Sequence, residues 1–476
     1  MKVIKSQVRL HASGRAVIQQ FLQLPGKDRV KDVVNRVKGF NEEMVAIYLA
    51  KVMNDFGSRH RNFTDGLMEH FKKVSEQYDG DISWFSENRK LLLGAYFTKE
   101  YSIQSAALFN PSIVSHPDQS GLNSGELRFI MSLRATGEGH ISSVVFKTGI
   151  IDRNAQFTLD QEDHYYTPLK KRTGSIYKKE FIFGCIEYFP LFNKELLQLL
   201  PDTFTAKEAI NILKKHSGEA DHISILILEE IFDTNYELYS DSRQHLAEKV
   251  LFPSSRSESV GIEDVRFVRF AMDDGSFCYY GTYTAYDGQQ IRTQLIETKD
   301  FMVFKVRALY GNAITDKGMA LFPEKINGKY AMIARQGGEI INIMYSDNVY
   351  CWDHYQLLME PEYAWELVQL GNCGSPVKTE KGWLLLTHGV GPVRTYVISA
   401  VLLDLDDPGR IIARLEKPLI EADGSEREGY VPNVVYTCGL LKHGNSLLIP
   451  YAVSDSATGF VTVGLDELLH EMTYKL

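Results

Sequence analysis

The chain has 476 residues, of which 44% are hydrophobic and 24% charged, a composition typical of folded globular proteins and unlike that of disordered ones. Fifty-two Lys and Arg against 61 Asp and Glu give a formal net charge of −9, which disfavours non-specific nucleic-acid binding. No run of 18 apolar residues predicts a membrane span, and the first nine residues lack the apolar core of a signal peptide. Five scattered cysteines argue against a disulfide framework, so we expect a cytoplasmic protein.

The first part of the chain, from about residue 14 to 80, has apolar residues at three- and four-residue intervals and predicts helices. Asn41 followed by two glutamates predicts a helix start. From about residue 90 the period shifts towards two, which predicts strands, until helical spacing returns between about 191 and 250. Thr205 and Glu208 form a capping box there, and the apolar run 225–228 is compatible with a helix or a buried strand.

An approximate repeat is the most informative feature of the remaining sequence. Five times a glycine precedes a short apolar strand, at Gly125, Gly275, Gly328, Gly382 and Gly444, and the last four lie 53, 54 and 62 residues apart. Such a unit suits a four-stranded propeller blade. We therefore predict a mainly β fold, a five-bladed β-propeller with an N-terminal helical region and a helical insertion in or after the first blade; the alternative is a β-sandwich.

The predicted organisation has four parts. Residues 1–90 form a helical N-terminal extension, 91–150 the first blade region, 151–260 the helical insertion and 261–476 the remaining blades. Because the innermost strand of each blade lines a shared channel, polar residues before each hairpin are expected to converge there. These residues are Asn110, Asp264, Lys325, Ser375 and Asn433.

Common cofactor and metal motifs are absent from the sequence. There is no Walker loop, dinucleotide fingerprint or histidine motif for a metal. The segment Asp404-Leu405-Asp406-Asp407 matches the Asp-x-Asp of metal-dependent nucleotide-sugar transferases, but it runs into an Asp-Pro-Gly sequence typical of a turn. We predict no metal site and no cofactor.

The segment Gly261-Ile262-Glu263-Asp264-Val265-Arg266 concentrates acids and a base on one predicted strand. Strand alternation would place Asp264 and Arg266 on one face and Glu263 on the other. Lys325 and His388 each follow an apolar strand. A buried lysine is costly without an accompanying anion, but each of these residues taken alone fits a snorkelling lysine or a hydrogen-bonded core histidine more often than an anion site.

These segments carry a resemblance to a known family. Residues 261–266, Ala320 through Tyr330, Gly382 through Val390, Leu402 through Pro408 and Val431 through Gly439 resemble, in this order, glycoside hydrolase family 130. Asn110-Pro111 and Ser132 through Ala135 resemble the first blade of that family, and the likeness covers about residues 105–150 and 260–465. The family contains inverting β-mannoside phosphorylases and some β-1,2-mannosidases, and the resemblance implies a five-bladed propeller.

The resemblance also implies residue roles. Asp264 corresponds to the general acid, with a proton path through a sugar hydroxyl in some members, and inorganic phosphate is the co-substrate. Phosphate would be held by Arg134, Lys325, His388 and Tyr396. A manno-oligosaccharide would be held by Asn110, Arg266, Arg335, Asn433 and Asp455, with Arg266 also orienting Asp264. Two departures stand out: Val265 replaces the usual proline, and the loop 391–394 before Tyr396 is short.

Several alternatives stay open at this point. Retention of Lys325 and His388 favours an inverting phosphorylase producing α-mannose 1-phosphate over a β-1,2-mannosidase. A metal-dependent mannosyltransferase and a non-catalytic carbohydrate-binding propeller are further alternatives. The helical additions are candidates for homo-oligomerisation or for covering the pocket, and neither nucleic acid nor a membrane is expected as a partner.

Overall fold

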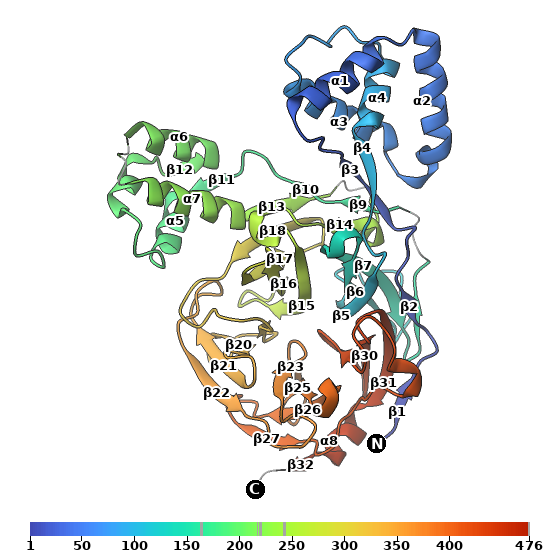
Figure 1. Cartoon of the computed structure of the whole chain (residues 1–476). Coiled ribbons are helices and arrows are strands. Elements are labelled where there is room, and N and C mark those ends of the chain that lie inside the picture. Colours follow the sequence, from blue (N-terminus) through green and yellow to red (C-terminus); the bar gives the residue numbers. More distant parts are fainter. Residues whose placement is uncertain (162–164, 217, 219–220, 241–243, 475–476) are drawn as a thin grey trace.

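The protein, described here from a computed structural model, is mainly β with helices (Figure 1). The structure describes residues 1–161, 165–216, 218, 221–240 and 244–474. The strands form a lower body in which successive antiparallel sheets follow one another around a common centre, and two helical parts stand above it. No helix in the described ranges is both long and apolar enough to cross a membrane.

The first two sets of strands share one twelve-stranded sheet. They are joined where Gly261 pairs in parallel with Ser142. The first set contains β5 (Ala107–Ser115), β6 (Leu127–Thr136), β7 (Ser142–Ile151) and β8 (Phe157–Leu159). The second contains β15 (Gly261–Ala271), β16 (Phe277–Tyr286), β17 (Ile291–Thr298) and β18 (Val303–Ala308). In both sets the strands pair in chain order, as a meander does.

Three further sheets complete the strand body. The third set is β19 (Ala320–Leu321), β20 (Tyr330–Ala334), β21 (Ile341–Ser346) and β22 (Tyr355–Met359). The fourth is β23 (Gln369–Asn372), β24 (Val377–Lys378), β25 (Trp383–Val390), β26 (Tyr396–Leu403), β27 (Ile411–Arg414) and β32 (Thr473–Tyr474). The fifth contains β28 (Val435–Tyr436), β29 (Leu441–His443), β30 (Ser446–Val453) and β31 (Ala457–Gly464), followed by helix α8 (Leu465–Glu471).

The repeated glycines occupy equivalent places in these sets. Each precedes the strand that follows the innermost one, and all five have a positive φ, between 55° and 157°: Gly125, Gly275, Gly328, Gly382 and Gly444. L-residues with side chains seldom adopt that region, so the spacing of these glycines reports the spacing of the hairpins. The sequence repeat therefore corresponds to a structural repeat of antiparallel hairpins.

The start of the chain belongs to the fifth sheet and not to a helical extension. Strands β1 (Val3–Lys5) and β2 (Leu10–His11) pair with β31, so that Val3 lies opposite Val463. The buried carboxylate of Glu426 secures them: it accepts from Lys5 at 2.7 Å and also from Arg9. The boundary predicted at residue 1 for a helical region therefore differs from the structure.

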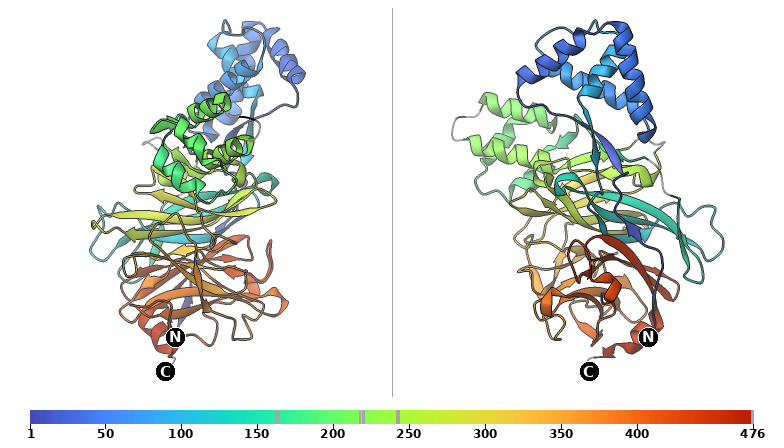
Figure 2. Two further views of the ribbon diagram at one scale, coloured as in Figure 1. Left: turned by 90° about the vertical axis from the view of Figure 1, so that its left-hand side faces the viewer. Right: turned by 45° about the vertical axis from the view of Figure 1, so that its right-hand side comes forward.

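The N-terminal helical unit has its own apolar core and stands apart from the strand body (Figure 2). It is attached through the pair β3 (Val17–Phe21) and β4 (Thr98–Ser102). Its helices are α1 (Lys27–Lys38), α2 (Glu42–Phe56), α3 (Phe63–Gln77) and α4 (Glu87–Tyr96). Asn41 caps α2 by accepting from the backbone N–H of Met44 at 2.8 Å, which confirms the predicted helix start.

The insertion between β7 and β15 is only partly helical. Helices α5 (Lys179–Ile186), α6 (Ala206–His216) and α7 (His222–Thr234) pack around one apolar cluster, beside the short pair β11 (Ile176–Lys178) and β12 (Thr203–Thr205). The capping box of Thr205 and Glu208 is present, and the run 225–228 lies in α7. Four strands return to the large sheet: β9 (Thr167–Pro168), β10 (Lys170–Lys171), β13 (Tyr236–Tyr239) and β14 (Lys249–Leu251).

Short 3-10 helices fill several connections. They span Gly57–Arg59, Glu138–His140, Lys194–Leu199, Leu246–Glu248, Arg256–Glu258, Pro392–Arg394 and Gly424–Glu426. The turn Pro392–Arg394 ends two residues before β26 begins at Tyr396.

Candidate active site

Two innermost strands, β5 and β15, bulge at the residues that the sequence singled out. Their pairing register shifts between Phe109 and Ser112 and between Glu263 and Arg266. Asn110 and Asp264 adopt left-handed φ values of 48° and 52° at these shifts, and Asn110 Nδ2 donates to Asp264 Oδ1 at 2.7 Å. Bulges re-aim side chains, and here they join two residues 154 positions apart.

Arg134 of β6 holds both acids of the segment. Its Nη2 lies 2.6 Å from Glu263 Oε1 and its Nη1 3.3 Å from Asp264 Oδ1, while its Nε donates to Ser142 Oγ. The predicted alternation, with Glu263 and Asp264 on opposite faces, is therefore wrong. The reason is the bulge, because a left-handed residue breaks the period of two.

Arg266 is 3% exposed and supports Asp264 through the backbone. Its Nη1 donates to the carbonyl oxygen of Asp264 at 3.1 Å, and its Nη2 donates to the hydroxyl of Tyr436. This hydrogen bond holds the backbone of the bulge at Asp264 in place.

His388 and Arg335 form a second, basic part of the site. Arg335 Nη1 lies 3.1 Å from His388 Nε2, and because arginine only donates, Nε2 must be the accepting nitrogen of a neutral imidazole. The His388 ring stacks on Tyr396 with centroids 5.8 Å apart and meets Tyr436 edge-on at 5.0 Å. Tyr436 is also the partner of Arg266, so this basic part adjoins the acids.

Lys325 does not join the site. Its Nζ lies 2.6 Å from Asp273 Oδ2 and 5.0 Å from the centre of the Tyr330 ring. Asp273 follows the last residue of β15, whereas Asp264 lies near its start, and seven residues of strand separate the two ends by roughly 20 Å. The expected meeting of Asp264, Lys325 and His388 is therefore correct for His388 and wrong for Lys325.

Lys317 and Arg394 were missed in the sequence. The charge of Lys317 acts on Glu263, Asp264 and Asp455, and that of Arg394 on Asp455. A signal for Lys317 was present: it precedes the buried run 318–322, as Asp264 precedes the buried run 265–268, whereas Lys325 follows its run. Arg394, in its short turn, carried no comparable signal.

Asp455 lies in a turn of the fifth sheet, and Asn433 lies in the segment that leads into its strand β28. Asp455 has φ 47° in the turn between β30 and β31, and Asn433 has φ 63°. The carbonyl oxygen of Asn433 accepts from the backbone N–H of Tyr396 at 3.0 Å, which ties it to the His388 side. Ser375, by contrast, is buried and forms no hydrogen bond through Oγ with a described residue.

The acids differ in pKa because their surroundings differ. Burial raises the pKa of Asp264, but Arg134, Arg266, Lys317 and Asn110 together bring it below its ordinary value. Burial raises the pKa of Glu263, against the effect of Arg134, and raises the pKa of Asp455 to about 6 with help from Asp264. Burial, then Arg335 and Arg266, hold the pKa of His388 well below its ordinary value, so the imidazole is neutral at pH 7.

Replacing Asp455 by Asn should stabilise the protein at alkaline pH. Since the pKa of Asp455 is raised on folding, its cost is absent below about pH 4 and complete above about pH 6. We expect Asp455→Asn to raise the free energy of unfolding at pH 8 by roughly 1–3 kcal/mol, and near pH 4.5 by only about a third of that amount. Denaturant titrations at both pH values measure this; an equal effect at both, or one matched by the exposed-loop control Glu428→Gln, would contradict it.

The Asp-x-Asp segment forms a turn. Asp404 Oδ1 accepts from the backbone N–H groups of Asp406 and Asp407, at 3.0 and 3.1 Å, and its other oxygen pairs with Arg410. No group of three or more metal-ligating side chains was found in the described part of the chain. The arrangement matches the turn interpretation of this segment.

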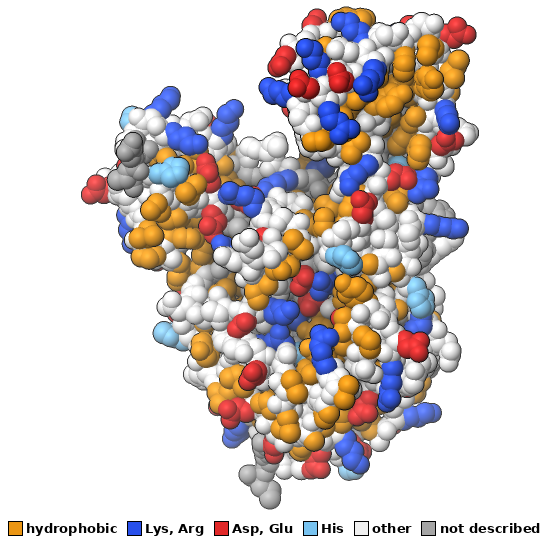
Figure 3. All heavy atoms as spheres, viewed as in Figure 1, with side chains coloured by type: hydrophobic (Ala, Val, Ile, Leu, Met, Phe, Trp, Pro, Cys, Tyr) orange, Lys and Arg blue, Asp and Glu red, His pale blue; other side chains and the backbone are white. Residues whose placement is uncertain are grey.

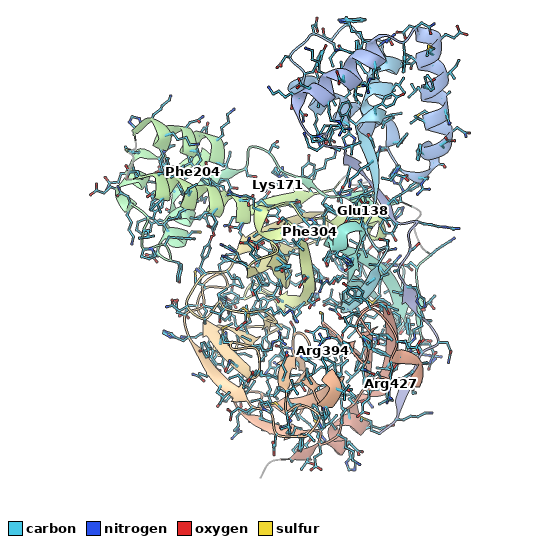
Figure 4. All side chains as sticks on the ribbon, viewed as in Figure 1. Glu138, Lys171, Phe204, Phe304, Arg394 and Arg427 are labelled. Atoms are coloured by element: carbon cyan, nitrogen blue, oxygen red, sulfur yellow. The ribbon has the colours of Figure 1, made fainter. Side chains whose placement is uncertain are left out.

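Basic side chains gather near the middle of the strand body. Figure 3 shows blue Lys and Arg atoms beside red acidic ones where the sheets converge, and Figure 4 places Arg394 in this central region. The site as a whole is thus a carboxyl group set among arginine, lysine and neutral histidine side chains, at the centre of a strand-rich body. This combination is chemically suited to acid–base chemistry beside a bound anion.

The chain belongs to glycoside hydrolase family 130. The family's sequence model, described as beta-1,4-mannooligosaccharide phosphorylase, matches residues 225–474. The chain is 34% identical over 228 residues to a 1,2-beta-oligomannan phosphorylase of Thermoanaerobacter sp. (strain X514), covering 47% of this chain and 75% of that protein. It is 32% identical over 231 residues to a beta-1,2-mannobiose phosphorylase of Listeria innocua, covering 47% of this chain and 63% of that one.

The match to solved structures extends over more of the chain. A structure of the Listeria innocua beta-1,2-mannobiose phosphorylase with beta-1,2-mannobiose has a TM-score of 0.47 at 22% identity, covering 77% of this chain and 92% of that one.

Proposed function

We propose that this protein is an inverting glycoside phosphorylase that cleaves a β-mannosidic bond with inorganic phosphate and releases α-mannose 1-phosphate. Membership of the family and the names of its relatives support phosphorolysis of β-mannosides. The arrangement of strands supports the finer fold proposal, a five-bladed β-propeller, since five successive sets of antiparallel strands surround one centre.

The observation that carries the proposal is the state of Arg335. Its side chain is 8% exposed, its Nη1 is used by a neutral histidine, and its Nε forms no hydrogen bond with any described residue. None of the ion pairs found among the described residues includes Arg335. A buried guanidinium without a counter-charge is unfavourable, and a phosphate dianion would supply both the charge and the acceptors.

Other cations and donors can complete a phosphate site. We assign phosphate binding to Arg335 and Lys317. His388 orients Arg335, and Tyr396 stacks on the His388 ring. Arg134 already faces two carboxylates, so we give it the role of holding the acids. Asn110, Asn433 and Asp455 are assigned to sugar hydroxyls, for which short polar side chains on fixed turns are suited.

The reaction balances with one carboxyl group. A phosphate oxygen forms the new bond to the anomeric carbon on the face opposite the leaving group, the glycosidic C–O bond breaks, and protonated Asp264 gives its proton to the leaving oxygen, directly or through a sugar hydroxyl. The proton that hydrogen phosphate loses on forming the ester restores the acid. Lys317, one of the cations that lower the pKa of Asp264, is also one that phosphate would neutralise. Phosphate binding therefore favours the protonated acid.

Turnover should depend on phosphate. We expect β-1,2- or β-1,4-mannobiose to be cleaved only when inorganic phosphate is added, with mannose 1-phosphate as the product and saturable phosphate dependence. Product analysis by ion chromatography measures this. Release of free mannose in phosphate-free buffer at an unchanged rate would instead support the hydrolase alternative, in which Glu263 or Asp455 would have to activate water.

A further inference from the structure

A cavity of about 260 Å³ lies between the helical insertion and the strand body. Helix α7 forms one side with Ile231, and the strands β17 and β18 and the loop that follows β18 form the other. Nothing in the proposed reaction uses this cavity. It exists only because the insertion packs against the second set of strands.

The lining has two chemical characters. Phe189, Ile231 and Tyr310 provide an apolar and aromatic wall, whereas Glu230, Arg292 and Asp316 provide charged groups. Glu230 and Arg292 pair with each other across α7 and β17. A wall for C–H groups together with a few polar groups in fixed positions is the surface that binds a sugar ring. The volume lies below the roughly 300–1,000 Å³ of sites for drug-sized ligands, which suits a single ring.

Part of the cavity lining lies on the same edge of the sheet as the acids. Gly261, three residues before Asp264, pairs with Tyr286 at the end of β16, and Tyr286 in turn pairs with Ile291 at the start of β17. Ile291 lines the cavity. The start of β15 and the lining residue Ile291 therefore lie along one edge, two strands and roughly 10 Å apart.

One loop connects the cavity with the active site. Asp316 lines the cavity, and its neighbour Lys317 acts electrostatically on Glu263 and Asp264. The loop is fixed there: Thr293 Oγ1 donates to the Asp316 carbonyl oxygen at 3.1 Å, and the Gly337 N–H donates to Asp316 Oδ2 at 2.8 Å. The loop therefore borders both the cavity and the acids.

We propose that the cavity is a distal subsite, formed by the insertion, that binds one sugar unit of an oligosaccharide whose scissile bond lies at Asp264. The inference rests on the proposed function and adds to it a preference for oligosaccharides over disaccharides. The insertion is then part of substrate recognition.

The test fills the cavity without touching the acids or the cations around them. In Gln290→Trp a large ring is introduced at an exposed lining position, and the backbone bond from Gln290 to Asp287 is retained. Gln289→Trp is the matched control, one residue earlier in the same turn and outside the lining. For the wild type and Gln289→Trp we expect kcat/KM for phosphorolysis to rise about tenfold or more from mannobiose to mannotetraose. Gln290→Trp should abolish this rise and leave the mannobiose value unchanged.

Binding measured without turnover distinguishes a failure of the subsite proposal from a failure of the proposed function. Calorimetric titration of mannobiose and mannotetraose, in both β-1,2 and β-1,4 series and without phosphate, should show tighter binding of the tetraose to the wild type and not to Gln290→Trp. Equal affinity for both lengths in the wild type, or an equal loss in both tryptophan variants, overturns the subsite. Mannobiose that is bound but never phosphorolysed overturns the proposed function, and the length dependence of binding still decides the subsite.

Discussion

Asp264→Asn should lower kcat/KM for phosphorolysis of mannobiose by roughly 10³-fold, because an amide cannot give a proton to the leaving oxygen. The fold should persist, since asparagine tolerates the left-handed φ of 52° at this position and its carbonyl can still accept from Asn110. Initial rates in the presence of phosphate measure the effect, and a single cooperative unfolding transition shows that the fold is retained.

Glu263→Gln is the matched control for this variant. Glu263 is the neighbouring carboxylate that pairs with the same arginine, Arg134. If only Asp264 moves the proton, the decrease in kcat/KM caused by Glu263→Gln should be at least tenfold smaller than the decrease caused by Asp264→Asn. An aryl β-mannoside has a leaving group that needs little protonation. Asp264→Asn should therefore cleave this substrate at most of the wild-type rate. Near-normal turnover of mannobiose by Asp264→Asn would remove Asp264 from the acid role.

Arg335→Ala should weaken the use of phosphate far more than any change at Lys325. Removing a buried charged donor from a bound anion costs about 2–4 kcal/mol, on the order of 30- to 1,000-fold in kcat/KM for phosphate. Lys325→Ala should stay within about twofold, because this lysine pairs with exposed Asp273 at the far end of β15. Phosphate titrations at saturating mannobiose measure both.

The comparison of these two variants also tests where the anion lies. If Lys325→Ala raised the phosphate KM as much as Arg335→Ala, the phosphate site would have to lie at the other end of the strands. Mannobiose affinity in phosphate-free buffer should be nearly the same in both variants, which separates phosphate binding from sugar binding.

Much of the fold was predictable because hairpin turns are local. The five glycines at Gly125, Gly275, Gly328, Gly382 and Gly444 mark turns whose geometry only the nearby residues decide. The return of β13 and β14 from the insertion to the large sheet was not predictable, since those strands are short and pair with distant partners. Pairing between distant strands leaves little trace in local periodicity.

The site was predictable to a similar extent. Asn110, Asp264 and His388 were found because they interrupt strongly apolar strands, and the structure brings them together around Arg134, Arg266 and Arg335. The contact between Glu263 and Arg134 could not be predicted from the sequence, because the bulge that breaks the alternation depends on β16 as well as β15. Lys317 was missed because it lies in a loop, where only its place before a buried run, and no periodicity, distinguishes it from other lysines.

The pairing of Val3 with Val463 has a consequence for biosynthesis. At translation rates of about 5–20 residues per second, the partner strand emerges on the order of 20 to 90 seconds after Val3 has left the ribosome. During that interval β1 and β2 remain unpaired, because both pair with β31. The helical unit of α1 to α4 has its own core and can already form. Nascent chains stalled before residue 457 should therefore be more sensitive to proteases in residues 1–11 than released ones.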